Sequence, residues 1–401
     1  MKFGVLGFDG QIASVTAAAR ARGDVIVLGC DLPAAALPAG TRIAPWEALL
    51  DAEACDAVLV GGEGWNEVRA EAVRKLVQAG RTLVLAQPLE LSMLWAYELD
   101  MIRRDSAARL IPFLPDRLHP FVGRLRRELE TGLASAGPLG TVESVEMTRR
   151  LADRGRDGVL RQLARDADLV RVLVGEPQRL STLGGAAADA AWATLAVGFT
   201  GAAAVPVRWR VARADRPGLE ITIVGAQGSR TVAAPDDPAL PWTWSTDGVP
   251  EAAAFDRGAA ILGVLAGASA TPADVEPAGW DDAARAIELA ETVPRSVAKG
   301  RAIDLHQEEF SEIGTFRGTM ASLGCGIVLA GLFVLLLATL VGGIAREAGW
   351  DLGERIAGLW PFAVLTVLGM FLALQVLPLF VATPDRRPGP GGPLAPAAER
   401  E

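Results

Sequence analysis

Short apolar runs alternate with longer helical patterns over the first part of the chain. Strands are expected at 2–6, 24–30, 56–60 and 81–86, and helices at 13–22 and 68–79. A short apolar run bounded by turn residues is typical of a strand that is buried on both faces. Strands and helices that alternate at this spacing indicate βαβ units, so we expect an α/β fold that begins with a parallel sheet.

The last quarter of the chain shows a different pattern, with two long uncharged runs. One lies between Arg317 and Arg346 and the other between Arg355 and Asp385. Roughly 20 apolar residues suffice for a helix to cross a bilayer. We therefore predict transmembrane helices at 320–345 and 357–382, joined by a short loop at 346–356. The alternative is a pair of buried core helices in a soluble protein.

The segments that flank these runs suggest how the chain would be placed at a membrane. Arg317 precedes the first run and Arg386 and Arg387 follow the second, so the distribution of positive charge predicts that both ends are cytoplasmic. Residues 307–319 are acidic and are expected to form a stalk, and the Pro/Gly-rich residues 383–401 a disordered tail. No signal-peptide pattern precedes the first apolar run. The expected protein is a multi-pass membrane protein with its larger, soluble part in the cytoplasm and the lipid bilayer as a partner.

Charge and composition exclude several classes of function. The net charge is −9, which argues against binding to nucleic acid. The two histidines and three cysteines do not have the spacing of a metal site, so no metal cofactor is expected. Only three of the 39 basic residues are lysines, which leaves few candidates for a catalytic lysine.

The turn after the first strand contains the candidate cofactor-binding residues Gly7, Asp9 and Gly10. In a Rossmann domain this turn reads GxGxxG, and an acid about 20 residues later binds the adenosine ribose. Asp31, at the end of the second strand, has the spacing for that acid. However, Asp9 stands where the second glycine would be, and its carboxylate would face the pyrophosphate of NAD or NADP. The alternatives are a dinucleotide site and an ordinary βα turn.

From residue 2 to about 306 the chain resembles the Gfo/Idh/MocA family of NAD(P)-dependent oxidoreductases. The resemblance rests on several stretches in order, among them DAVLVGG, EAVRKLVQAGRTLVLAQPLE, PDRLHPFVGRLRRELETGLASAGPLGTVESVE, DADLVRVLVGEP and GWDDAARAIELAETVPRSVAKGRAIDL. It implies a Rossmann-like domain at 1–118 and an α/β domain at 119–306. The large, mostly antiparallel sheet of the second domain would form one wall of the active-site cleft, and in this family it commonly mediates homodimers.

The chain departs from the catalytic pattern of that family. The family's lysine after the fourth strand is replaced by Gln87, and its histidine three residues before Asp168 is replaced by Arg165. Hydride transfer to or from a carbinol needs a group that takes or gives the hydroxyl proton. A glutamine amide does not titrate, and an arginine stays protonated. The usual proton relay is therefore expected to be absent.

Two candidate catalytic residues remain. His119, at the junction of the predicted domains, could act as an acid or base or could be structural. Asp168 could orient a ligand, or it could pair with Arg161 or Arg165 on its own helix. The arginine-rich segment 153–166 could bind an anion or could form Asp–Arg pairs on a solvated helix.

Three hypotheses follow from these patterns. The first is a membrane-anchored pseudoenzyme that binds a small-molecule ligand or a partner. The second is an active NAD(P)-dependent oxidoreductase, acting on a sugar, a polyol or an envelope-linked substrate with relocated acid and base groups. The third is a scaffold that dimerises through its large sheet.

Overall fold

The computed structural model describes residues 1–32, 40–134, 137–183, 190–201, 205–246, 249–267 and 275–305, together with isolated positions between 333 and 366. Residues 1–306 form one compact unit and residues 307–401 a second. The predicted stalk at 307–319, membrane helices at 320–345 and 357–382, loop at 346–356 and tail at 383–401 lie outside the described residues, apart from those isolated positions. None of the helices in the described part of the chain combines the length and apolar content needed to cross a bilayer.

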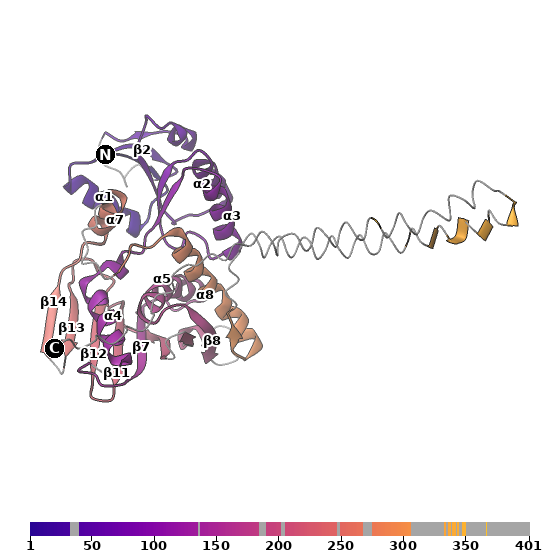
Figure 1. Ribbon diagram of the computed structural model, residues 1–401. Helices are drawn as coiled ribbons and strands as arrows, with labels where there is room; N and C mark the ends of the chain where they lie inside the picture. The colour runs from indigo at the N-terminus through magenta and orange to yellow at the C-terminus, as the bar shows by residue number, and fades with distance from the viewer. Residues whose placement is uncertain are drawn as a thin grey trace, which may run out of the picture. The chain divides into compact units, whose positions relative to one another are not determined.

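The first sheet has six parallel strands in the order β3-β2-β1-β4-β5-β6 (Figure 1). The strands are β1 (Lys2–Leu6), β2 (Val25–Cys30), β3 (Arg42–Ile43), β4 (Ala57–Val60), β5 (Thr82–Leu85) and β6 (Arg109–Pro112). The connecting segments include α1 (Gly10–Ala21), η2 (Trp46–Leu50), α2 (Glu67–Gln78) and α3 (Met93–Arg104). Every residue of β4 is buried, as expected for a parallel strand covered on both faces. The strand order is that of a Rossmann fold, so the predicted Rossmann-like sheet is confirmed.

The second sheet has nine strands in the order β14-β13-β12-β11-β7-β10-β9-β8-β15. The pair β7 and β10 is parallel and the other pairs are antiparallel. The strands are β7 (Val142–Leu151), β8 (Pro177–Leu183), β9 (Ala196–Gly201), β10 (Pro206–Arg213), β11 (Gly218–Gly225), β12 (Gly228–Pro235), β13 (Trp242–Thr246), β14 (Val249–Ala253) and β15 (Ile303–Asp304). This mixed sheet confirms the prediction of a large, mostly antiparallel second sheet.

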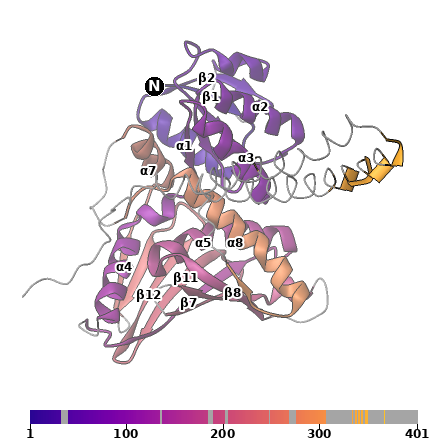
Figure 2. The ribbon, with the colours of Figure 1, turned by 45° about the vertical axis from the view of Figure 1, so that its right-hand side comes forward.

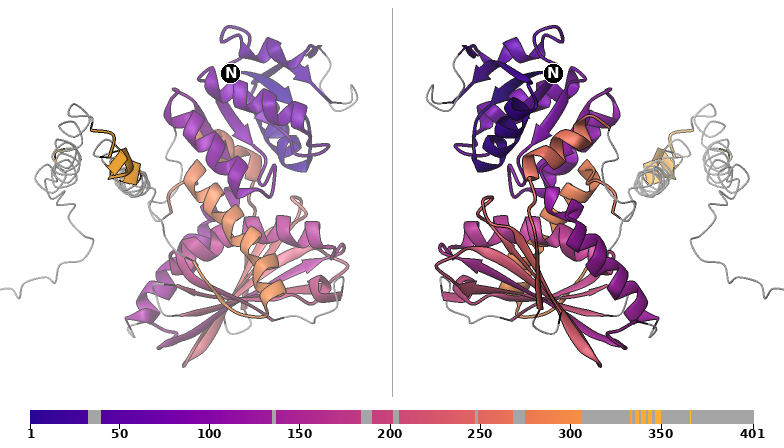
Figure 3. Two further views of the ribbon diagram at one scale, coloured as in Figure 1. Left: turned by 90° about the vertical axis from the view of Figure 1, so that its right-hand side faces the viewer. Right: turned by 90° about the vertical axis from the view of Figure 1, so that its left-hand side faces the viewer.

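Helices cover one face of the mixed sheet. They include α4 (Pro120–Leu133), α5 (Arg156–Val174) and α8 (Trp280–Lys299), which lie on the same side of the sheet in both views of Figure 3. Along β10, Val207, Trp209 and Val211 are buried whereas Arg208 and Arg210 are exposed. Such alternation is typical of a sheet with one packed face and one solvated face.

The chain returns to the first sheet after β14, before β15 completes the mixed sheet. The helix α7 (Arg257–Leu265) packs against α1, where a Cβ atom on Gly258 would lie 2.2 Å from the Ser14 carbonyl oxygen. The next helix, α8, begins with Trp280 in the apolar core of the first sheet and continues into the core of the mixed sheet with Leu289 and Val293. Figure 2 shows α8 running from one sheet to the other. The boundary between 118 and 119 stays a prediction, because α7 packs its apolar side chains into the core of the first sheet and α8 packs into both cores.

Candidate functional site

A cavity of about 1200 Å³ lies between the two sheets. Its walls come from one face of α1, the start of η3 (Pro115–Leu118), one face of α5 and the segment that leads into α7. The polar groups in the wall include Asp9, Gln11, Arg149, Arg165 and Asp168. Phe113, Leu114, Leu169 and Phe255 add apolar surface. Its size is ample for a small organic ligand.

Asp9 caps α1 with its own side chain. Its Oδ1 accepts hydrogen bonds from the amides of Gln11 and Ile12, both at 2.9 Å, and its Oδ2 accepts one from Gly62 at 2.7 Å. The amides at the first turn of a helix are the groups that bind pyrophosphate in a Rossmann domain. Here a carboxylate of the chain already occupies them, so a pyrophosphate would have to displace Asp9 and would meet its negative charge.

Arg69 on α2 lies directly beneath the turn that carries Gly7. A Cβ atom on Gly7 would lie 2.5 Å from Arg69 Nη1, and the φ angle of Gly7 is +66°. The guanidinium donates to the carbonyls of Gly61 and Glu63 and to Asp31 Oδ2, which it reaches through Nε at 2.9 Å and Nη2 at 2.6 Å. Both bonds to Asp31 use one oxygen, and the side chain of Asp31 is 55% exposed. The side chain of Asp31 therefore stays largely exposed, whereas Asp9 holds the first-turn amides of α1 with its own carboxylate.

Gln87, at the position of the family's lysine, is buried and faces α8. Its Nε2 donates to the Ala283 carbonyl at 3.2 Å. Its backbone amide and carbonyl are paired with the side chain of Gln11 through two bonds of 2.9 Å. The bond between Gln87 and Pro88 is cis. The Gln87 side chain thus connects the segment after β5 to α8 through a hydrogen bond. It does not line the cavity.

Arg165, at the position of the family's histidine, lines the cavity. Its Nε donates to the Gln87 carbonyl at 2.7 Å. Burial lowers the pKa of Arg165, and the positive charge of Arg149 adds to that effect. The nearby carboxylates of Asp9, Asp166 and Asp236 act in the opposite direction. The guanidinium is therefore held in a place where its charge is only partly compensated.

Asp168 is bound by Arg117 and by neither of the partners considered from its own helix. Arg117 donates to Asp168 Oδ1 through Nη2 at 2.6 Å and to Oδ2 through Nε at 3.0 Å. The pairing with Arg161 or Arg165 was therefore wrong, because the α5 face that carries Asp168 packs against η3, where Arg117 lies. Burial raises the pKa of Asp168 to about 6, and the charge of Arg117 opposes this rise.

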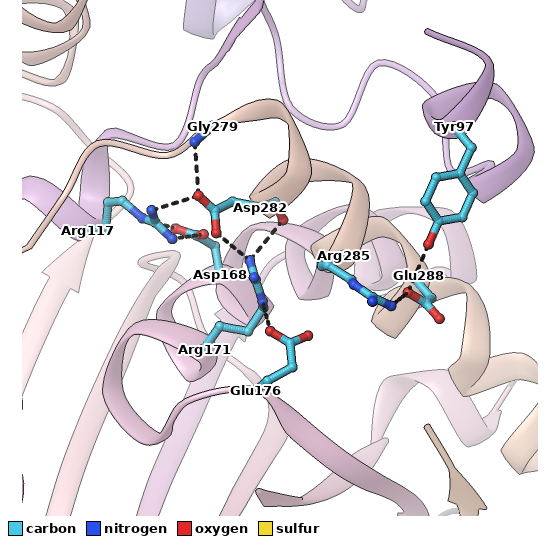
Figure 4. A network of polar contacts seen from close by, with 9 residues as sticks. All are labelled: Tyr97, Arg117, Asp168, Arg171, Glu176, Gly279, Asp282, Arg285 and Glu288. Carbon is cyan, nitrogen blue, oxygen red and sulfur yellow. Dashed lines mark hydrogen bonds and ion pairs between the residues drawn. The ribbon is translucent and has the colours of Figure 1, made fainter. Parts of the chain in front are cut away.

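The pair belongs to a chain of charged groups shown in Figure 4. Arg117 also donates to Asp282 on α8 at 3.1 Å, and Arg171 donates to Asp282 at 2.8 Å and to Glu176 at 2.7 Å. These contacts join η3, α5 and α8, which supports a structural role for the network. Asp168 lines the cavity, yet both its carboxylate oxygens are occupied by Arg117.

His119 is buried beside the cavity without lining it. Its Nδ1 accepts from the Phe121 amide at 3.0 Å and so caps α4, and its ring stacks on Trp242 at a centroid distance of 4.1 Å. Burial lowers the pKa of His119 to about 4. These contacts are those of a structural histidine, and they do not bring it together with Asp9 or Arg165.

Three arginines line the cavity, and two of them have carboxylate partners. Arg149 donates through Nε to Asp166 at 2.8 Å and through Nη1 to Asp236 at 2.8 Å. Arg257 donates to Asp116 at 2.6 Å. In the described part of the chain, no ion pair involves Arg165. Arg69, Arg117 and Arg149 were not identified as candidates from the sequence. For Arg69 a signal existed, because it shares the buried face of α2 with Val73 and Leu76.

Comparison with solved structures identifies the fold. The chain is similar to a putative myo-inositol dehydrogenase from Sinorhizobium meliloti, with 21% identity, a TM-score of 0.58, and coverage of 76% of this chain and 100% of that one. It is also similar to the WlbA dehydrogenase from Bordetella pertussis in complex with NADH and UDP-GlcNAcA, with 17% identity, a TM-score of 0.56, and coverage of 77% and 99%. A levoglucosan dehydrogenase in complex with NADH gives 14% identity, a TM-score of 0.58, and coverage of 77% and 99%.

The chain shares its fold with these dehydrogenases. No family model matches the chain, and no curated protein matches its sequence. At these identities the likeness concerns the fold, and the chemistry of the site has to be argued from the residues of this chain.

Proposed function

We propose that this protein is a ligand-binding pseudoenzyme on an oxidoreductase fold, which binds a small molecule between its two sheets without transferring hydride. The observation that supports this proposal most strongly is the carboxylate of Asp9 on the amides of Gln11, Ile12 and Gly62. Gln87 and Arg165 add to it, because neither can relay a proton under ordinary conditions. The cavity itself is retained, at about 1200 Å³.

The alternative is an active NAD(P)-dependent oxidoreductase that uses His119 and Asp168. It has less support, since His119 does not line the cavity and Asp168 is occupied by Arg117. Some of the similar structures contain NADH, and their cofactor is the one this alternative would require.

Titration of the purified full-length protein with NADH and NADPH distinguishes the two functions. We expect no saturable change in nicotinamide fluorescence, and no turnover of a panel of polyols and sugars with either dinucleotide. The levoglucosan dehydrogenase, measured in parallel, serves as a positive control for NADH binding. Saturable binding of either dinucleotide in the micromolar range, or turnover of any member of the panel, would refute the pseudoenzyme.

We further propose that the uncharged runs at 320–345 and 357–382 anchor the protein in a membrane, with both ends in the cytoplasm. The support is their length and lack of charge. Extraction of cell membranes with alkaline carbonate should leave the full-length chain in the pellet and release a chain that ends at residue 306. A homodimer through the mixed sheet is a separate proposal, and sedimentation equilibrium of the full-length protein in detergent tests it.

A further inference from the structure

Arg165 stands apart from the other charged groups in the cavity wall. Its Nε is bound to the Gln87 carbonyl, and its two Nη groups make no hydrogen bond to any residue in the described part of the chain. Neither Nη group is fully buried, and Arg165 lines the cavity. The guanidinium is therefore enclosed by protein at Nε and open to the cavity at its far end.

The carboxylates around the cavity are already engaged by the protein. Asp9 accepts three backbone amides, and Asp168 is held by Arg117. Asp116 is paired with Arg257 at 2.6 Å, and Asp236 with Arg149 at 2.8 Å. Asp256 caps α7 by accepting from the Ala259 amide at 2.9 Å. Among the arginines of the described cavity wall, Arg165 is thus the one without an ion-pair partner.

A partly buried charge without an ion-pair partner is unfavourable for folding, and the chain keeps one here. The free end of the guanidinium offers two parallel N–H donors, a geometry that matches the two oxygens of a carboxylate. A phosphate dianion matches the same two donors but carries twice the charge of a carboxylate. The carboxylates of Asp9, Asp166 and Asp236 are close enough to Arg165 to act on it electrostatically, so they would repel an anion bound there. Their repulsion favours a singly charged anion over a doubly charged one.

We propose that the cavity binds a small organic carboxylate, whose oxygens accept hydrogen bonds from the two Nη groups of Arg165. The inference rests on the proposed function, in that it names the ligand class of the same cavity. The apolar surface of Phe113, Leu169 and Phe255 would contact the carbon skeleton of the ligand. Arg165 is then a ligand-binding residue in the position where the family has a histidine.

Saturation-transfer NMR of the full-length protein with sodium lactate, sodium acetate and sodium glucuronate tests this assignment at matched ionic strength. We expect saturable binding of at least one carboxylate in the millimolar range or tighter. Lactamide, which has the shape of lactate without its charge, should bind far more weakly. Arg165→Gln should weaken carboxylate binding by about tenfold or more, because it removes a charged pair of donors. Arg165→Lys keeps the charge but loses the paired donors, so its affinity for carboxylate should lie between those of the wild type and Arg165→Gln.

Arg161→Gln is the matched control. Arg161 lies one turn earlier on α5, donates to the Pro88 carbonyl at 3.2 Å and does not line the cavity, so this variant should bind carboxylate like the wild type. Three results would each overturn the proposal: no saturable binding of any of the three carboxylates, equal binding of lactate and lactamide, or unchanged binding by a folded Arg165→Gln protein. Tighter binding of inorganic phosphate than of every carboxylate would also overturn it. The comparison of lactate with lactamide uses the wild type alone, so it remains decisive if Arg165→Gln does not fold.

The same samples separate this inference from the proposed function. Binding of NADH would refute the pseudoenzyme and leave the carboxylate result standing. If neither carboxylates nor NADH bind, the proposed carboxylate ligand is refuted, and the proposal that the protein does not use a dinucleotide remains.

Discussion

Replacing Arg117 with methionine would leave the carboxylate of Asp168 buried without its counter-ion. The two side chains are only 7% and 2% exposed, and they are joined by bonds of 2.6 and 3.0 Å. Removing one partner of such a pair costs about 3–5 kcal/mol, since the remaining charge stays out of water. We therefore expect Arg117→Met to lower the free energy of unfolding by an amount in this range at about pH 8.

The penalty should depend on pH in a defined direction. Burial raises the pKa of Asp168 to about 6 from an ordinary value of 3.8, and Arg117 opposes that rise. Without Arg117 the pKa of Asp168 should be higher still. When the pKa of a carboxyl group is higher in the folded state than in the unfolded state, its protonated form stabilises the fold. This stabilisation is complete below the unfolded-state pKa and is lost as the pH rises through the folded-state pKa. The difference between wild type and Arg117→Met should therefore shrink between about pH 8 and about pH 5.

Urea unfolding followed by tryptophan fluorescence measures both quantities. The double variant Arg117→Met with Asp168→Leu is the control, because it removes both charges and should be more stable than Arg117→Met alone at about pH 8. A penalty below about 1 kcal/mol for Arg117→Met, or a penalty that grows as the pH falls, would refute the reasoning that a buried ionised Asp168 depends on Arg117.

Other variants test other parts of the site. Asp9→Ala removes the cap of α1 and the bond to Gly62, so thermal unfolding should show a loss of about 2–3 kcal/mol, and Asp9→Asn, which keeps the cap, should lose less. Gly258→Ala places a Cβ atom against the Ser14 carbonyl, and urea unfolding should show a loss of about 1–3 kcal/mol. Burial lowers the pKa of His119 to about 4 from 6.5. The neutral imidazole therefore stabilises the fold above pH 6.5, and this contribution to stability is lost as the pH falls towards 4. This group alone should contribute about 3 kcal/mol to the pH dependence of urea unfolding, and that component should vanish in His119→Asn.

The predictable part of the fold is the part encoded by local patterns. The strands at 2–6, 24–30, 56–60 and 81–86 were recognisable because a parallel strand covered on both faces reads as a short apolar run. Their observed bounds agree to within one residue. The resemblance to a known family predicted the mixed sheet, since no local pattern states which strands will pair.

The site was less accessible from the sequence, because its contacts join residues that are distant along the chain. Asp9 departs from the pattern of a dinucleotide turn in the sequence itself, but its bond to Gly62 spans 53 residues and has no local signal. The partner of Asp168 comes from 51 residues earlier, whereas helical spacing predicts pairing only between neighbours on α5. Helical spacing describes one element at a time, and these ion pairs are made where two elements pack.

The packing of the late helices α7 and α8 into the core of the first sheet has a consequence for how the protein is made. The apolar core of the first sheet includes Ile261, Leu262, Trp280 and Ile287 as well as residues up to Leu114. On the ribosome, the first six strands therefore emerge with part of their core still missing, and eight of the nine strands of the mixed sheet are synthesised before the missing side chains arrive. The N-terminal sheet should be a client of chaperones during translation, and a ribosome stalled before residue 257 should expose a nascent chain that is sensitive to protease.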